Sequence, residues 1–360
     1  MKRALGIIIG VAVSVFFFAL SMRGTSPEEL KAGFANANYL TLPLMLGMLF
    51  GFYWLKAMRW AWLLSPVKPL TTGQLFPPLL IGFAANNILP AHLGEFVRVF
   101  VVNRQHRIPA TTVLSTVVLE RIFDVVAILA LFGLGLMFTN TMPDEYRRNA
   151  VILGGLCVVA VLGVAVYLIW TEWFLKVAGT IMGWVLPHAI AEKILGMLRA
   201  GADGLAALKS GKMVALIALS SLAQWLLNGL IAYAALKAFH VPVTPTAGLI
   251  VTGVTAFGVT IPSTPGYVGV IQYCFKISIA AVGLDVNPSL VFASSLYYHL
   301  CMYVPVTGLG LYYLFSRGLR LRDLANVADT QVAAPKADVA DGVADGVAED
   351  TAVQRPTATT

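Results

Sequence analysis

The sequence predicts an all-α polytopic membrane protein with six full spans and two re-entrant hairpins broken by proline and glycine. Of its 360 residues, 58% are hydrophobic and only 12% are charged, about half the charged fraction of a soluble domain. Several apolar runs exceed the roughly 20 residues that a helix needs to cross a bilayer. Two apolar stretches also contain polar residues, which lipid tolerates only where they are packed in protein or line a wet cavity.

The six predicted spans cover about residues 4–21, 39–63, 108–138, 149–170, 213–237 and 288–315. The first run could be read as a signal peptide, but no small-residue cleavage site precedes Met22, so we expect a retained helix. Two further stretches, about 72–102 and 246–282, are interrupted by Pro and Gly. Because proline breaks the hydrogen-bonding pattern of a helix, we interpret both as re-entrant hairpins.

Basic residues set the expected orientation. With the N-terminus inside, the cytoplasmic segments hold thirteen cations and the outside loops hold five. Since Lys and Arg are enriched on the cytoplasmic side, we expect a multi-pass protein of the cytoplasmic membrane with both termini in the cytoplasm. The net charge of +7 fits contact with anionic lipid, and nothing in the sequence predicts binding to nucleic acid.

Two segments lie outside the predicted spans. Residues 171–212 are too polar to span, and they carry an apolar stripe with two tryptophans: Ile190, Ile194, Leu198, Leu205, Trp173 and Trp184. This pattern predicts an amphipathic helix on the cytoplasmic surface, with a regulatory lipid sensor as the alternative role. Residues 325–360 repeat "VADG", lack aromatics and carry a net charge of −4, which predicts a disordered acidic tail after a membrane domain of residues 1–324.

The membrane domain shows signs of an internal repeat. At an offset of 175 residues, nine identities fall within 66 ungapped positions, among them Pro90 with Pro265 and Gly94 with Gly269. Both broken stretches and both following spans keep register, with a first unit at about 39–138 and a second at about 213–315. The predicted orientation runs in opposite directions through the two units, which indicates an inverted-topology repeat of the kind found in secondary transporters.

The first broken stretch contains the motif "AANNILPAHLGEFVR". Pro90 breaks the helix, Gly94 permits close backbone approach, and Asn86 and Asn87 can satisfy the freed carbonyls. Glu95 and Arg98 follow three apart and share a helix face. The alternatives are a turn patched by polar groups and a binding site for a polar head group.

The motif "LERIFDVV" places charges in the middle of a span. Glu120 lies about 12 residues into its helix, or roughly 18 Å, and Asp124 follows on the same face, where like charges repel. The cations available to neutralise them are Arg98, Arg59 and Arg121. We predict a buried network that links Arg98 to Glu120 or Asp124, and Arg121 to Glu95. It acts either as a structural lock or as a gate or phosphate site, since Arg binds phosphate through two parallel hydrogen bonds.

The second broken stretch contains "TIPSTPGYVGVIQ", with Pro262, Pro265, Gly266 and Gly269. Such a segment cannot form one continuous helix. A helix that starts after Pro265 would direct its N-terminal N–H groups at the cavity, where they favour an anion. The alternative is a simple kinked span.

Isolated polar residues receive more ordinary interpretations. We expect Lys56 and Arg59 to extend to the cytoplasmic interface, and His299 to be a hydrogen-bonded packing residue rather than a proton carrier. Cys157, Cys274 and Cys301 have no metal-ligand spacing and are expected to pack in the core. No HExxH, Walker or GxSxG motif occurs, so we expect neither a cofactor nor an enzyme.

Together, "NNILPAHLGEFVR", "ERIFD" and "PSTPGYVGV" resemble the lysylphosphatidylglycerol synthetase transmembrane-region family, also called flippase-like membrane proteins. The likeness covers about residues 40–315. It implies a helical membrane protein that moves or handles polar lipids. Carried over by position, the family's motif residues are Asn87, Pro90, Gly94, Glu95, Arg98, Glu120, Arg121, Asp124, Pro262, Pro265, Gly266 and Gly269.

Three positions depart from the family pattern: His92 replaces a usual Arg, Tyr267 a usual Gly, and Gln272 a frequent Glu. The loss of one cation and one anion leaves the head group open. The tail after Leu324 is shorter than the soluble aminoacyl-transfer domain of the full-length synthetases, so we expect no synthetase activity.

We therefore expect a protein that translocates or binds a polar or anionic lipid, with a homo-oligomer left open. The residues expected to bind the lipid are Asn87, His92, Glu95, Arg98, Glu120, Arg121, Asp124, Pro265, Gly266, Gly269 and Gln272. The alternatives are a lipid head-group transferase, with His92 and Glu95 as acid and base, and an accessory protein of lipid or envelope synthesis.

Overall fold

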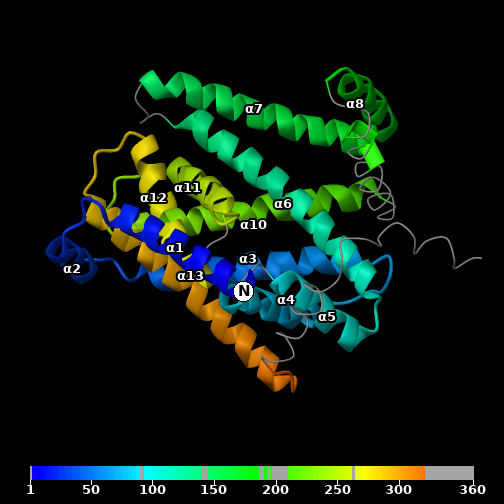
Figure 1. The fold of residues 1–360 in the computed structure, drawn as a ribbon, viewed down its shortest axis with the longest axis horizontal. Coiled ribbons are helices and arrows are strands. Elements are labelled where there is room, and N and C mark those ends of the chain that lie inside the picture. Colours follow the sequence, from blue (N-terminus) through cyan, green and yellow to red (C-terminus); the bar gives the residue numbers. More distant parts are fainter. Residues whose placement is uncertain are drawn as a thin grey trace, which may run out of the picture.

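A computed structural model describes residues 2–89, 93–139, 144–185, 190–192, 195–196, 210–261 and 264–320, and this part of the chain is helical without strands (Figure 1). The elements are α1 (Lys2–Met22), α2 (Pro27–Ala35), α3 (Thr41–Leu64), α4 (Thr72–Ile88), α5 (Gly94–His106), α6 (Ala110–Phe138), α7 (Asp144–Ile169), α8 (Thr171–Val185), α10 (Gly211–Ala238), α11 (Pro245–Gly258), the 3₁₀ helix η1 (Pro265–Tyr267), α12 (Val270–Ala281) and α13 (Pro288–Ser316).

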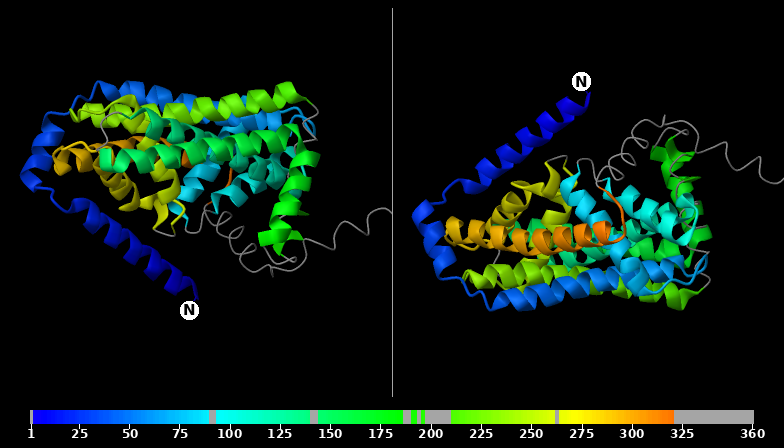
Figure 2. Two further views of the ribbon diagram at one scale, coloured as in Figure 1. Left: turned by 90° about the horizontal axis from the view of Figure 1, so that it is seen from above. Right: turned by 90° about the horizontal axis from the view of Figure 1, so that it is seen from below.

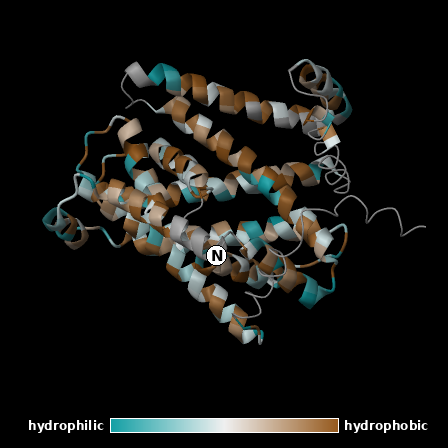
Figure 3. Ribbon diagram, viewed as in Figure 1, coloured by the Kyte–Doolittle hydropathy of each residue, from teal (hydrophilic) through white to brown (hydrophobic). Residues whose placement is uncertain are grey.

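Three of the described helices, α3, α10 and α13, are long and apolar enough to cross a membrane. Helices α1, α6 and α7 coincide with the other three predicted spans, and α6 carries Glu120, Arg121 and Asp124 near its middle. Figure 3 shows hydrophobic residues along most of the bundle, with hydrophilic residues gathered in α2 and near several helix ends. The chain is therefore a helical membrane protein.

The first broken stretch folds as two helices, α4 and α5. Helix α4 begins with a capping box between Thr71 and Gln74. It ends before Leu89, whose extended backbone (ψ 145°) is the conformation expected of a residue that precedes proline. Pro90, Ala91 and His92 lie outside the described residues.

A contact between two glycines holds α4 against α5. A Cβ atom on Gly94 would overlap the carbonyl oxygen of Gly82, and one on Gly82 would overlap that of Gly94. The N–H of Gly94 donates to Oδ1 of Asn86 at 2.7 Å. The sequence led us to expect that Asn86 and Asn87 bind carbonyl groups freed by the break. Asn86 instead accepts from a free N–H, and Asn87 donates to the Thr307 hydroxyl at 2.8 Å.

The second broken stretch differs from its prediction. The expected helix does not start after Pro265, because Gly266 (φ 78°) and Tyr267 (φ 59°) adopt left-handed conformations. Instead α12 begins at Val270, and the N–H of its N-cap, Gly269, donates to Oε1 of Gln272 at 2.7 Å. A Cβ on Gly269 would overlap the carbonyl oxygen of Ser14 in α1, so this helix end faces α1 and not the anion site that we expected.

Helix bounds recur at the predicted offset of 175 residues. Adding this offset to Gly94, the first residue of α5, gives Gly269, the N-cap of α12. The order α3–α4–α5–α6 is repeated as α10–α11–α12–α13, and the two halves interlock because α4 packs on α13 while α11 packs on α6. Two equivalent glycines permit these crossings, with Gly135 of α6 against Thr246 and Gly310 of α13 against Leu80.

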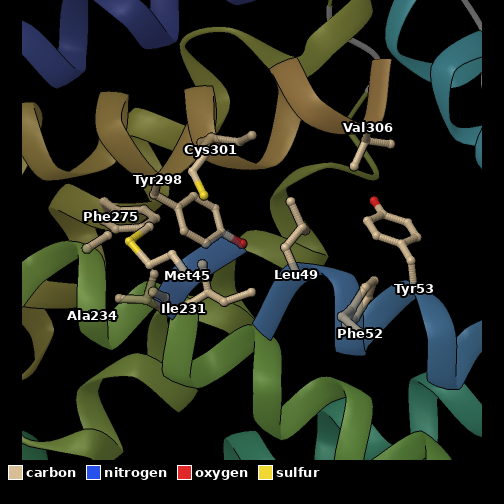
Figure 4. Close-up of a cluster of buried hydrophobic side chains, with 14 of the residues drawn as sticks. Met45, Leu49, Phe52, Tyr53, Ile231, Ala234, Phe275, Tyr298, Cys301 and Val306 are labelled. Atoms are coloured by element: carbon tan, nitrogen blue, oxygen red, sulfur yellow. The ribbon is translucent and has the colours of Figure 1, made fainter. Parts of the chain in front are cut away.

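The main core lies where α3 of the first half packs against α10 and its neighbours in the second half (Figure 4). Met45 and Leu49 of α3 face Ile231 of α10, with Phe275 of α12 and Tyr298 of α13 beside them. All three cysteines are free and buried, which confirms their prediction as packing residues.

Helix α1 lies beside α12, and its N-terminal end diverges from the bundle in both views of Figure 2. The hydroxyls of Ser14 and Thr264 are 2.7 Å apart, and Nζ of Lys276 donates to the Leu20 carbonyl at 3.0 Å. The first helix is thus joined to the second broken stretch at its middle and at its end.

Helix α8 crosses one end of the bundle (Figure 2). It corresponds to the first part of the amphipathic helix predicted over 171–212, and Trp173 and Trp184 are exposed on it. Ile194, Leu198, Leu205 and the tail 325–360 lie outside the described residues.

We predict that Gly94→Ala destabilises the protein, because the added methyl group must push α5 away from the Gly82 carbonyl. Overpacking of this kind costs about 1–3 kcal/mol, which we expect as a lowered Tm in detergent. Gly47→Ala is the matched control, since a Cβ there meets nothing within 4 Å. Equal melting temperatures for the two variants would contradict the close-contact interpretation.

Candidate functional site

A cavity of about 260 Å³ lies between the two halves of the membrane domain. Its walls come from α3, α4, α5 and α6 of the first half and from α10, α11, η1, α12 and α13 of the second. Its charged lining residues within the described chain are Glu95 and Arg121, and three asparagines, Asn86, Asn87 and Asn228, also line it. A ligand here would contact both halves at once.

Seven charged side chains form a connected group at the first-half wall, which we call the ion cluster. Its members are Lys56 and Arg59 of α3, Glu95 and Arg98 of α5, and Glu120, Arg121 and Asp124 of α6. Because a buried charge is costly unless it is paired, these pairs explain how α6 can hold two carboxylates in an apolar bundle.

Asp124 is the most heavily bonded carboxylate of the cluster. One oxygen, Oδ1, accepts from Arg59 at 2.8 Å, from Gln224 at 2.7 Å and from Trp225 at 3.0 Å. The other, Oδ2, accepts from Nζ of Lys56 at 2.8 Å. These bonds tie α6 to α3 and α10.

Glu120 ties α6 to α5. Its Oε2 accepts from Arg98 at 3.0 Å, while Oε1 lies 3.3 Å from Nζ of Lys56 and 3.2 Å from Nη2 of Arg121. The guanidinium group of Arg98 also lies over the Trp60 ring, 5.0 Å from its centroid. Glu120 and Arg98 are both buried, so this part of the cluster is closed to the cavity.

The cluster reaches the cavity only at one edge, where Arg121 and Glu95 pair at 3.3 Å. The side chain of Arg121 is 39% exposed and that of Glu95 is 32% exposed, whereas the other five members are almost fully buried. A ligand in the cavity can therefore contact Arg121 without disturbing the buried pairs.

The cluster has more positive charge and more donors than its own carboxylates can use. Four cations face three carboxylates, which leaves a charge of +1. At the cavity edge, Nε of Arg121 makes an ion pair with Glu95 but has no hydrogen-bond partner among the described residues. Since guanidinium groups bind phosphate and carboxylate through paired N–H bonds, the cavity edge suits an anion.

The structure confirms two predicted ion pairs, Arg98 with Glu120 and Arg121 with Glu95. The expectation that Lys56 and Arg59 extend to the interface is wrong, because both are buried and bind Asp124. Arg59 is instead one of the counter-charges that the sequence offered to the two carboxylates. The reason is that α3 packs beside α6 and α10, so the carboxylates attract these cations inward. The sequence did contain a signal for this pairing. Lys56 and Arg59 are three residues apart and share one helix face, and Glu120 and Asp124 are four apart and share another.

The predicted site residues fall into four groups. Asn87 and Gly266 line the cavity with Glu95 and Arg121. Arg98, Glu120 and Asp124 lie behind its wall, as part of the ion cluster. Pro265, Gly269 and Gln272 do not line it; Nε2 of Gln272 lies 3.0 Å from Nδ1 of His299, which is buried and hydrogen-bonded as predicted. His92 lies outside the described residues.

Sequence reasoning missed the neutral wall that faces the ion cluster. Oδ1 of Asn228 accepts from the hydroxyls of Thr252 at 3.2 Å and Tyr298 at 3.1 Å, and all three residues line the cavity. An asparagine inside the apolar span α10 was the signal, because an unpaired polar group in lipid is costly. The cavity thus has one charged edge and one hydrogen-bonding wall.

We predict that Asp124→Asn destabilises the protein by about 3–5 kcal/mol, the usual cost of removing one partner from a buried ion pair. Glu95→Gln is the matched control at the exposed edge and should change Tm far less. Thermal unfolding in detergent measures both.

The double variant Lys56→Met with Asp124→Asn should recover part of the lost stability, because it removes one of the cations that Asp124 neutralises. A Tm for Asp124→Asn equal to that of Glu95→Gln would show that the buried pairs do not stabilise the fold.

Comparison with known proteins gives two relatives. The chain is 24% identical over 331 residues to a protein named glycosyltransferase AglD from Haloferax volcanii, covering 83% of this chain and 52% of that protein. It is 24% identical over 238 residues to UPF0104 membrane protein MJ1078 from Methanocaldococcus jannaschii, covering 65% of this chain and 95% of that protein. The chain therefore spans about half the length of AglD.

No solved structure matches the chain. Residues 7–310 match the family described as the lysylphosphatidylglycerol synthase TM region. This range contains the first half of the bundle, the second half up to residue 310 in α13, the lining of the cavity and the whole ion cluster. The chain belongs to the lysylphosphatidylglycerol synthase TM region family.

Proposed function

We propose that the cavity binds the anionic head group of a membrane lipid and that the protein moves this head group across the cytoplasmic membrane. The observation that carries the proposal is the position of Arg121, which joins a cluster of surplus positive charge to a cavity between the two halves. A phosphate is the favoured anion because the guanidinium fork matches its geometry.

Binding proceeds by exchange of one anion for another. The Glu95 carboxylate lies 3.3 Å from Nε of Arg121. A phosphate that enters the cavity takes over the N–H donors of Arg121 and displaces the Glu95 carboxylate from it. The three asparagines and the hydroxyl of Tyr298 then supply neutral hydrogen bonds to the rest of the head group.

The proposed architecture supports movement across the bilayer. In it, α1, α3, α6, α7, α10 and α13 span the membrane, while α4–α5 and α11–α12 enter and leave on the same side. The two halves then form an inverted-topology repeat, which places a substrate site at the repeat interface near mid-membrane. Both termini lie in the cytoplasm, because the segments on that side hold most of the basic residues.

The relative named glycosyltransferase AglD favours a second candidate function, transfer of a group onto a lipid head group within the cavity. Glu95 lines the cavity and would act as the base, with His92 as its partner. A third role, as an accessory protein of lipid or envelope synthesis, requires only a lipid-binding cavity.

We predict that Arg121→Gln removes at least nine-tenths of the phosphate-containing lipid that co-purifies with the protein, measured by mass spectrometry of the extracted lipids. Arg147→Gln is the matched control, since Arg147 is exposed at the start of α7 and does not line the cavity. Equal retention by both variants would place the lipid elsewhere and contradict the proposal.

Movement is tested separately in vesicles that contain fluorescent phosphatidylglycerol or fluorescent phosphatidylcholine. We expect the wild-type protein to speed the exchange of phosphatidylglycerol between leaflets at least tenfold over protein-free vesicles, with little effect on phosphatidylcholine. Arg121→Gln should abolish the acceleration. If the wild-type protein retains lipid but does not speed the exchange between leaflets, it binds lipid without moving it, and the proposal of translocation is wrong.

Analysis of the lipids of a strain that lacks the protein separates translocation from transfer. Translocation predicts an unchanged lipid composition with an altered distribution between leaflets. The loss of one modified lipid species would instead support the transferase.

A further inference from the structure

A second hollow lies on the surface of the bundle, between α6 and α7. It is a groove of about 320 Å³, and its lining is formed by Val118, Arg121, Ile122, Val125, Val126, Leu129 and Val161. Six of these seven residues are aliphatic. The groove is open to the surroundings of the bundle, because Val118 and Val125 are both about half exposed.

Arg121 lines both this groove and the cavity, and among the residues that the structure describes it is the only one that the two linings share. Ile122, Val125, Val126 and Leu129 continue from it at helical spacing, so the groove follows one face of α6 for about 12 Å beyond Arg121. The charged edge of the cavity and the apolar groove therefore meet at a single guanidinium group.

A lipid has the same arrangement, with an anionic group joined to hydrocarbon chains. A water-soluble anion would use the cavity edge but would have no use for the groove. In a bilayer the groove supplies little hydrophobic driving force, because lipid chains are as apolar as valine. What it supplies is a packed surface along which a chain can stay in apolar surroundings while the head group enters the polar cavity.

We propose that an acyl chain of the bound lipid lies in the α6–α7 groove while its phosphate contacts Arg121 in the cavity. The proposal rests on the function proposed above and adds the route by which the lipid reaches the site from the side, between α6 and α7. The groove holds one acyl chain of the substrate lipid. The ion pair between the phosphate of that lipid and Arg121 determines where the chain lies.

The test fills the groove with an indole ring and compares two probes. Val125→Trp blocks the groove, where Val125 is 51% exposed; Val159→Trp is the control, since Val159 of α7 is 64% exposed and does not line the groove. We expect Val125→Trp to lower the binding of phosphatidylglycerol at least tenfold. Its binding of glycerol phosphate, which has no acyl chain, should match the wild type, and Val159→Trp should alter neither.

Arg121→Gln separates the failure of this inference from the failure of the proposed function, because it should abolish the binding of both probes. If Arg121→Gln loses phosphatidylglycerol while Val125→Trp retains it, the cavity binds the head group but the groove does not hold the chain. If Arg121→Gln also retains phosphatidylglycerol, both proposals are wrong.

A second measurement avoids any effect of the large indole on folding. Phosphatidylglycerol with a photoreactive group in its acyl chain is irradiated on the unmodified protein, and the adducts are located by mass spectrometry. We expect them within residues 118–129 of α6 and near Val161. Adducts spread evenly over exposed residues of other helices, such as Leu219 and Tyr312, would show that ordinary bilayer lipid fills the groove and would overturn the inference.

Discussion

The structure depends on the neutralisation of two carboxylates on one face of α6. Glu120 and Asp124 lie within an apolar bundle where no water is at hand to solvate them. They are satisfied by cations from α3 and α5 and by neutral donors from α10. The same requirement thus determines which helices surround α6, and it brings the surplus cation Arg121 to the cavity edge.

At the positions that correspond to the ion cluster, the second half carries no Asp, Glu, Lys or Arg. At the offset that relates the halves, Lys56, Arg59 and Asp124 correspond to Ile231, Ala234 and His299. Ile231 and Ala234 lie in the apolar core of Figure 4, and His299 pairs with the neutral amide of Gln272. One wall of the cavity is therefore held by ion pairs and the other by close packing and neutral hydrogen bonds. A ligand between them meets two surfaces of different chemistry, which fits a molecule with a charged end and an uncharged polar part.

Much of this arrangement follows from the sequence, because apolar runs fix helices and prolines fix their ends. The pairing of Arg98 with Glu120 could be predicted since lipid leaves few partners for a carboxylate. Lys56 and Arg59 were misplaced because a hydropathy profile gives depth along one helix and not the neighbour it faces. The start of α12 and the role of Asn228 depend on a left-handed backbone at Gly266 and on contacts between distant helices. Neither is encoded in a local pattern.

The ion cluster also constrains how the chain is made. Lys56 and Asp124 are 68 residues apart, so α3 leaves the ribosome well before its counter-charges exist. An unpaired Lys or Arg at the centre of a helix costs roughly 2.5–3.5 kcal/mol to insert, and α3 carries two. Until α6 is made, α3 therefore lacks the carboxylate that binds both cations in the folded protein. The burial of Lys56 and Arg59 is complete only once α3 and α6 have come together.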